Sequence, residues 1–137
     1  MNLKLTATAL LTKALSFAAQ KLGGGTDRPG SIALKLYPQV LKALKYDGKI
    51  IAVTGSNGKT TTSNLIAHVL REQGYSVVNN AKGSNLTSGI ATTLLCASTL
   101  GGRVKADYVV LEVDECYSPF GITICSIRFA PATSAPA

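Results

Sequence analysis

The sequence predicts an α/β domain in which a parallel sheet is flanked by helices, preceded by a helical segment at the N-terminus. Short apolar runs at 49–54, 75–78 and 108–113 alternate with stretches at 59–73 and 86–99, whose apolar residues recur at helical spacing. Strands that alternate with helices of this length pair in parallel through right-handed crossovers, because each helix must cover a face of the sheet.

The composition is typical of a folded chain. Of the 137 residues, 46% are apolar and 15% are charged, which excludes disorder throughout. Three cysteines fit neither a disulfide framework nor the paired spacing of a structural zinc site, and we interpret them as reduced thiols of a cytoplasmic protein. Cys96 falls on an apolar-rich helix, where we expect it to pack as a small hydrophobic residue.

Most of the net charge of +7 lies in the N-terminal part, since residues 1–49 carry eight Lys/Arg and two Asp/Glu, which gives +6. These cations are spaced singly and have few aromatic neighbours, so we predict solvated helix faces and no nucleic-acid partner. The first twenty residues are predicted to form an amphipathic helix that packs on the domain or lies near a membrane surface, with a cleaved signal peptide as the alternative. Its expected apolar face consists of Leu3, Ala7, Leu10, Leu11, Ala14, Leu15, Ala18 and Leu22.

Glycine and proline mark the boundaries between the expected elements. Residues 23–30 are predicted to be a loop because of their glycine and proline content. Pro38 then opens a short helix, which Asp47-Gly48 closes. Gly74 and Gly101 follow the two helices that flank the sheet, at the position where a helix-terminating glycine is expected.

A glycine loop between the first strand and its helix concentrates the chemistry of the sequence. Its glycines let backbone amides turn toward phosphate oxygens, the following helix offers its positive end, and Lys59 can neutralise the β- and γ-phosphates of ATP. Val53 stands where the general GxxxxGK[ST] pattern has its first glycine. We predict a P-loop NTPase-like site, with a plain glycine-rich connector as the alternative. The expected ATP-binding residues are Gly55, Ser56, Asn57, Gly58, Lys59, Thr60 and Thr61.

These residues resemble the ATP-binding loop of the Mur ligases, which has the form TG-[TS]-NGKTT. The related folylpolyglutamate synthases place Gly-Ser after the lysine, so Thr60 favours the Mur side. About fifty residues precede the loop, too few for the UDP-binding domain of most Mur ligases, and this favours the short-headed MurT-type branch. Further similarity to that branch lies in residues 29–38, 79–90 and 111–115.

This resemblance implies an ATP-dependent carbon–nitrogen ligase of peptidoglycan synthesis. In lipid II isoglutaminyl synthase, ATP activates the α-carboxyl of the D-isoglutamate in the lipid II stem peptide. A GatD-like glutamine amidotransferase subunit then delivers ammonia from glutamine. The resemblance also implies a cytoplasmic location near the inner face of the membrane. A non-catalytic nucleotide-binding fragment, a folylpolyglutamate synthase-like protein and an unrelated P-loop ATPase remain as alternatives.

The resemblance further implies a Mg²⁺ site formed by Thr60 and Glu112, since Glu112 corresponds to the glutamate with which the family coordinates nucleotide-bound Mg²⁺. The alternative for Glu112 is a solvent-facing acid at a strand end. Strand alternation places Asp114 on the same side as Glu112 and Glu115 opposite. A loop near substrate or phosphate, or else an ordinary turn, is expected at Asn80, Gly83, Ser84 and Asn85. No catalytic residue is predicted.

We divide the chain into a helical segment and loop (1–48), a partial Mur ligase central ATP-binding domain (49–115) and a divergent, disordered tail (116–137). The resemblance ends after Glu115, without the remaining central domain, the zinc ribbon and the C-terminal domain of the family. We therefore expect a truncation or a change of reading frame, an incomplete sheet, and a chain that does not complete the amidation by itself.

Overall fold

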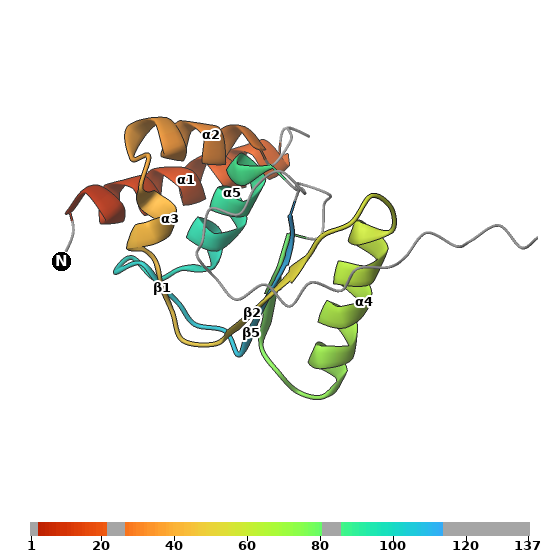
Figure 1. Cartoon of the computed structure of the whole chain (residues 1–137). Coiled ribbons are helices and arrows are strands. Elements are labelled where there is room, and N and C mark those ends of the chain that lie inside the picture. The colour runs from red at the N-terminus through yellow and green to blue at the C-terminus, as the bar shows by residue number, and fades with distance from the viewer. Residues whose placement is uncertain (1–2, 22–26, 81–85, 114–137) are drawn as a thin grey trace, which may run out of the picture.

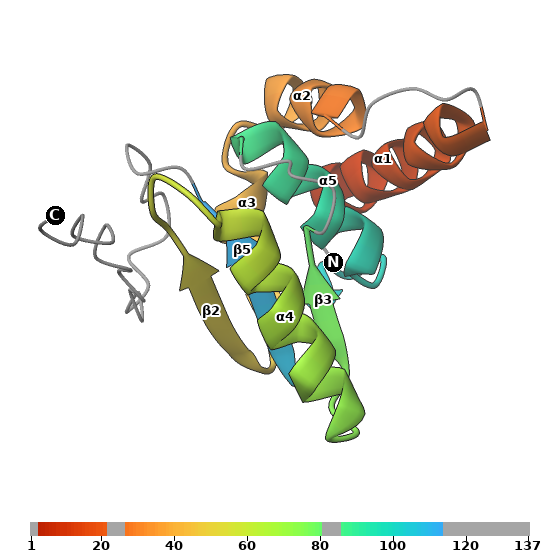
Figure 2. The same cartoon turned by 90° about the vertical axis from the view of Figure 1, so that its right-hand side faces the viewer.

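The structure, a computed structural model, describes residues 3–21, 27–80 and 86–113 as a central sheet with helices on both faces (Figures 1 and 2). Helix α4 (Lys59–Glu72) covers one face of a central sheet, and helix α5 (Thr87–Ala97) covers the other. Two further helices, α1 (Leu3–Lys21) and α2 (Asp27–Leu36), pack against α5 on the side away from the sheet. The predicted α/β class, with parallel strands flanked by helices, is confirmed.

The central sheet has the strand order β2-β5-β3, with both pairs parallel. Its strands are β2 (Lys49–Val53), β3 (Val77–Asn79) and β5 (Tyr108–Glu112), so the second strand begins at Val77 and not at Tyr75 as expected. The register places Val53 opposite Glu112. The strand that leads into the glycine loop and the strand that carries the predicted metal ligand therefore end side by side.

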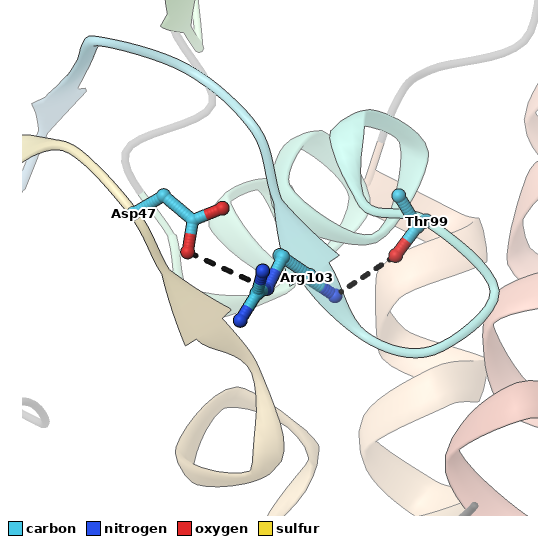
Figure 3. Close-up of polar contacts among 3 residues, drawn as sticks. All are labelled: Asp47, Thr99 and Arg103. Carbon is cyan, nitrogen blue, oxygen red and sulfur yellow. Dashed lines mark hydrogen bonds and ion pairs between the residues drawn. The ribbon is translucent and has the colours of Figure 1, made fainter.

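A two-stranded parallel sheet lies beside the helices and was not predicted. It pairs β1 (Lys45–Tyr46) with β4 (Arg103–Val104), and the Lys45 N–H donates to the Gly102 carbonyl at 2.9 Å. Arg103 Nε lies 3.5 Å from Asp47 Oδ1, and the Arg103 N–H donates to Thr99 Oγ1 at 3.2 Å (Figure 3). Because the ion pair is exposed, the backbone bonds contribute more to this pairing than the charges do.

The prediction of a loop over residues 23–30 is wrong for its C-terminal half, because helix α2 begins at Asp27. Pro29 lies in this first turn, where a missing N–H removes no helical hydrogen bond. Gly30 lies where α2 approaches α5, and a Cβ at this position would be 1.8 Å from the Ser88 carbonyl oxygen. Helix α3 (Val40–Ala43) follows, after a turn that contains Pro38.

Helix α1 confirms the predicted N-terminal helix, but its expected apolar face does not pack on the domain, which was one of the two predicted alternatives. The buried residues are Leu5, Thr8, Ala9, Thr12 and Ser16, whereas Leu3, Leu10, Leu11 and Phe17 are exposed. The hydroxyls of Thr8 and Thr12 each donate at 2.8 Å to a carbonyl four residues earlier in α1. This internal bonding satisfies the hydroxyls, so small polar side chains can be buried against α5 and α2 at little cost.

Cys96 on α5 is likewise exposed and does not pack as a core residue, in contrast to our expectation. Its Sγ donates to Ser16 Oγ on α1 at 3.3 Å. None of the helices that the structure describes has the length and apolar character needed to cross a membrane. Cys116, Cys125 and the predicted tail (116–137) lie outside the described residues.

The alternating side chains of β5 divide the hydrophobic core between the two faces of the sheet. Val109, Leu111 and Val113 belong to the larger cluster, with α1, α2 and α5. Val110 packs on the other face, in a smaller cluster with residues of β2 and α4. Because alternate residues share a face, Glu112 lies on the same side as Val110, toward the beginning of α4.

Candidate nucleotide-binding site

The loop between β2 and α4 depends on two glycines with positive φ. Gly58 immediately precedes α4 with φ +75°, and Gly55 has φ +147°, both in a region that residues with a side chain rarely adopt. Gly58, the N-cap residue, makes no side-chain hydrogen bond to the first N–H groups of α4. Exposed amides at the start of a helix attract anions, which is the geometry that phosphate binding requires.

Lys59, the first residue of α4, folds back over this loop. Its Nζ donates to the Gly55 carbonyl oxygen at 2.7 Å, and the side chain is half-buried. The ammonium group therefore lies over the loop and adds its positive charge to that of the helix terminus.

Thr60 and Glu112, the two residues predicted as metal ligands, are in direct contact. Thr60 Oγ1 donates to Glu112 Oε2 at 2.8 Å, although the residues are 52 positions apart in the sequence. Glu112 is only 4% exposed and is therefore not the solvent-facing acid of the alternative interpretation. The described residues contain no group of three or more His, Cys, Asp or Glu side chains that could hold a metal ion. One carboxylate and one hydroxyl instead suit Mg²⁺, which is commonly held by one or two protein ligands, water and substrate phosphates.

Asn80 holds the backbone of Glu112 with both ends of its side-chain amide. Its Oδ1 accepts the Glu112 N–H at 2.8 Å, and its Nδ2 donates to the Glu112 carbonyl at 3.0 Å. Since Asn79 is the last residue of β3 paired with β5, this side chain continues the hydrogen bonding of the ladder by one step. Asn80 was expected in a loop near substrate or phosphate, or else in an ordinary turn; its side chain is 4% exposed and bonds to the backbone of Glu112. Gly83, Ser84, Asn85, Asp114 and Glu115 lie outside the described residues.

A second polar network, which the sequence did not suggest, joins α4 to β3. Asn79 Nδ2 donates to Asn64 Oδ1 at 3.0 Å, and Arg71 Nη2 donates to Asn79 Oδ1 at 2.7 Å. No local pattern marks these three residues, because their partners come from other elements of the fold.

Thr54, directly before the loop, has a buried hydroxyl without a hydrogen-bond partner among the described residues.

The parallel sheet with a glycine loop at the start of α4 defines the class of the protein, an α/β domain of the P-loop type. Residues 53–121, about half of the chain, match the family described as the Mur ligase middle domain. The chain therefore belongs to the Mur ligase family, whose members are ATP-dependent amide ligases of peptidoglycan synthesis.

Several curated proteins of this family are similar to the chain. Subunit MurT of the lipid II isoglutaminyl synthase (glutamine-hydrolyzing) of Streptococcus pneumoniae (strain ATCC BAA-255 / R6) is 38% identical over 84% of this chain and 25% of its own length. The MurT subunit of Staphylococcus aureus (strain N315) is 40% identical, over 66% of this chain and 20% of its own. The UDP-N-acetylmuramoylalanine–D-glutamate ligase of Nitratidesulfovibrio vulgaris (strain DP4) is 43% identical, over 56% and 15%. The chain thus spans a quarter or less of these relatives.

Proposed function

We propose that this chain binds Mg-ATP at the loop before α4, as the ATP-binding part of a Mur-ligase-type, amide-forming enzyme. The observation that carries the proposal is the Thr60–Glu112 contact of 2.8 Å, which joins the start of α4 to the end of β5. A hydroxyl beside a carboxylate at the end of parallel strands, next to the N-terminus of a helix, combines phosphate and Mg²⁺ ligands in one place.

Each residue of the site has a separate role in this proposal. Backbone amides of Gly55 to Gly58 and the start of α4 would bind phosphate oxygens, and Lys59 would neutralise part of their charge. Thr60 and Glu112 would hold Mg²⁺, with Thr60 releasing its present bond to Glu112 Oε2. The bound ion would offset the negative charge on the phosphates during transfer.

The finer proposal concerns the acceptor and the partner. The similarity to MurT subunits supports ATP-driven activation of the D-isoglutamate α-carboxyl of lipid II, with ammonia supplied by a GatD-like glutamine amidotransferase subunit. Such a reaction would take place in the cytoplasm, near the inner face of the membrane that holds lipid II. The chain would contribute the ATP half, because positioning of the carboxylate requires groups beyond the glycine loop.

Calorimetric titration with Mg-ATP tests the nucleotide site. Lys59→Ala should reduce the binding free energy by roughly 2–5 kcal/mol, by analogy with removing one member of a desolvated charge pair. Lys49→Ala is the matched control, since Lys49 is exposed at the opposite end of β2. Equal affinities of the parent chain and Lys59→Ala would refute the proposed site.

The acceptor is tested by mass spectrometry of the lipid II stem peptide after incubation with the chain, Mg-ATP, glutamine and a GatD-type subunit. We expect Mg-ATP binding without the acid-to-amide change, which would show that this chain binds the nucleotide but does not complete the amidation. Amide formation above the control that contains the GatD-type subunit alone would show that the chain also positions the carboxylate.

A further inference from the structure

The outward side of α1 is apolar although it faces away from the domain. Its large hydrophobic residues are strongly exposed: Leu3 by 77%, Phe17 by 64%, Leu10 by 50% and Leu11 by 41%. They recur at intervals of three and four residues together with exposed alanines, so they form one stripe along the helix. We call this stripe the α1 outer face; it consists of Leu3, Ala7, Leu10, Leu11, Ala14, Phe17 and Ala18.

The orientation of α1 follows from the size of the side chains on its inner side. Small side chains of that side, among them Thr8, Ala9 and Thr12, allow α1 to lie close to α5 and α2. Both views place α1 in the helical layer on the opposite side of the sheet from α4 (Figures 1 and 2). A contiguous apolar stripe on such an outer layer is characteristic of a surface that binds another protein or a membrane.

The charges around the α1 outer face are positive. Residues 1–36 contain five Lys/Arg and one Asp, and of the three lysines on α1 only Lys13 turns inward, where its Nζ donates to the Ser98 carbonyl. Lys4 and Lys21 are exposed at the two ends of α1, and Lys21 Nζ lies 4.9 Å from the centroid of the Phe17 ring. In such a pair, the aromatic ring can lie among the acyl chains while the lysine ammonium remains at the level of the headgroups. Apolar stripes edged by lysines are typical of helices that lie on anionic membranes.

We propose that the α1 outer face docks on an anionic lipid surface, with the helix axis parallel to the membrane plane. Leu10 and Phe17 enter the boundary between headgroups and acyl chains, while Lys4 and Lys21 contact the lipid phosphates. The inference concerns α1 alone and does not rest on the proposed nucleotide site. Lipid binding and Mg-ATP binding can therefore succeed or fail separately.

Co-sedimentation with vesicles tests the proposal on the 137-residue chain. Vesicles of equal parts phosphatidylcholine and phosphatidylglycerol should bind the chain, whereas vesicles of phosphatidylcholine alone should bind it weakly. The double variant Leu10→Gln/Phe17→Gln should lose roughly tenfold or more in vesicle affinity, because it removes two apolar groups from the bilayer boundary. Its Mg-ATP affinity should match that of the parent chain.

The matched control is Leu65→Gln/Val69→Gln, which changes two apolar residues of α4 that are 60% and 51% exposed. This control should keep the vesicle affinity of the parent chain. Lys4→Gln and Lys21→Gln should each reduce the affinity by about fivefold, and added salt should reduce it further. Thermal unfolding of each variant verifies that the fold is retained.

Several results would overturn the proposal. These are no vesicle binding by the parent chain, equal binding to both kinds of vesicle, and equal losses in the α1 and α4 double variants. A dimer seen by light scattering and lost in Leu10→Gln/Phe17→Gln would assign the α1 outer face to a second copy of the chain. A complex with a GatD-type subunit that is lost in the same variant would assign the face to that protein.

Discussion

At the scale of single residues, Glu112 is held from three directions. Asn80 binds its N–H and its carbonyl, Thr60 binds its carboxylate, and the following Val113 N–H donates to the Val53 carbonyl at 3.0 Å. The carboxylate is thereby fixed at the beginning of α4 before any ligand arrives. A ligand that needs this oxygen meets a positioned group and does not have to order it.

Glu112→Gln should weaken the Mg²⁺ dependence of nucleotide binding more than nucleotide binding itself. The substitution removes one anionic ligand while preserving the shape of the side chain. Calorimetric titration of ATP at a series of Mg²⁺ concentrations measures the effect. Superimposable Mg²⁺ curves for the two proteins would contradict the role assigned to Glu112.

Asn80→Asp should destabilise the fold by about 1–3 kcal/mol, the cost of leaving a buried polar group without its partner. The aspartate would keep the acceptor for the Glu112 N–H but would face the Glu112 carbonyl with an oxygen where Nδ2 now donates at 3.0 Å. Urea denaturation measures the change. Gln39→Glu provides the same amide-to-carboxylate exchange at an exposed position, and an equal loss there would show that the Asn80 bonds contribute nothing specific.

At the scale of elements, the contact between α2 and α5 determines how closely the helical layer packs. Gly30 is buried where the two helices approach, and Thr92 Oγ1, on the next turn of α5, donates to the Ser88 carbonyl at 2.9 Å. This carbonyl is the same atom that a Cβ at residue 30 would meet. The glycine is therefore required by proximity, since its own φ is not positive.

Gly30→Ala should cost about 1–3 kcal/mol or more, because the obstacle is backbone of α5 and cannot rotate away. The added carbon would lie 1.8 Å from the Ser88 oxygen and 2.5 Å from Thr92 Oγ1. Gly101→Ala is the control, as its nearest neighbour would be 3.9 Å away. Equal urea midpoints for Gly30→Ala and the parent chain would show that α2 can move away from α5 without penalty.

At the scale of the whole molecule, Tyr46 links stability to alkaline pH. Burial raises the pKa of Tyr46 from 10.0 to about 12, and its hydroxyl donates to the Leu41 carbonyl at 3.4 Å. The folded state thus retains a proton that the unfolded state loses. This contribution to stability is complete below pH 10 and disappears as the pH rises through 12.

Tyr46→Phe should consequently lose less stability than the parent chain between pH 10 and pH 12. Urea denaturation across this range measures the difference between the two free energies of unfolding. Tyr75→Phe, at a side chain that is 46% exposed, serves as the control. Parallel pH profiles for the parent chain and Tyr46→Phe would contradict the effect of burial on the tyrosine.

The parts of the molecule that could be predicted from the sequence are those with local signals. The apolar run that becomes β2, the glycine loop and the helical spacing of α4 each depend on adjacent residues, and all three were placed correctly. The strands β1 and β4 were missed because they are two residues long and pair across more than fifty residues. The face with which α1 packs on the domain was not predicted, because it depends on how closely small side chains can approach α5, which periodicity does not report.

The candidate site shows the same division. Lys59 and Thr60 could be recognised from their neighbours, and the resemblance to the Mur ligases indicated Glu112. The hydrogen bonds of Asn80 could not be predicted, since an asparagine after a strand is equally typical of an ordinary turn. Its role emerges only from the register that aligns β3 with β5.

The separation of 52 positions between Thr60 and Glu112 affects the order in which the protein folds. Helix α4 and its glycine loop can form from interactions near in sequence, whereas the parallel pairing of β2 with β5 must close a long segment of chain first. Non-local closure of this kind is slow, because the chain loses conformational entropy before the two strands can hydrogen-bond to each other. During synthesis the loop therefore leaves the ribosome well before the carboxylate that completes the site.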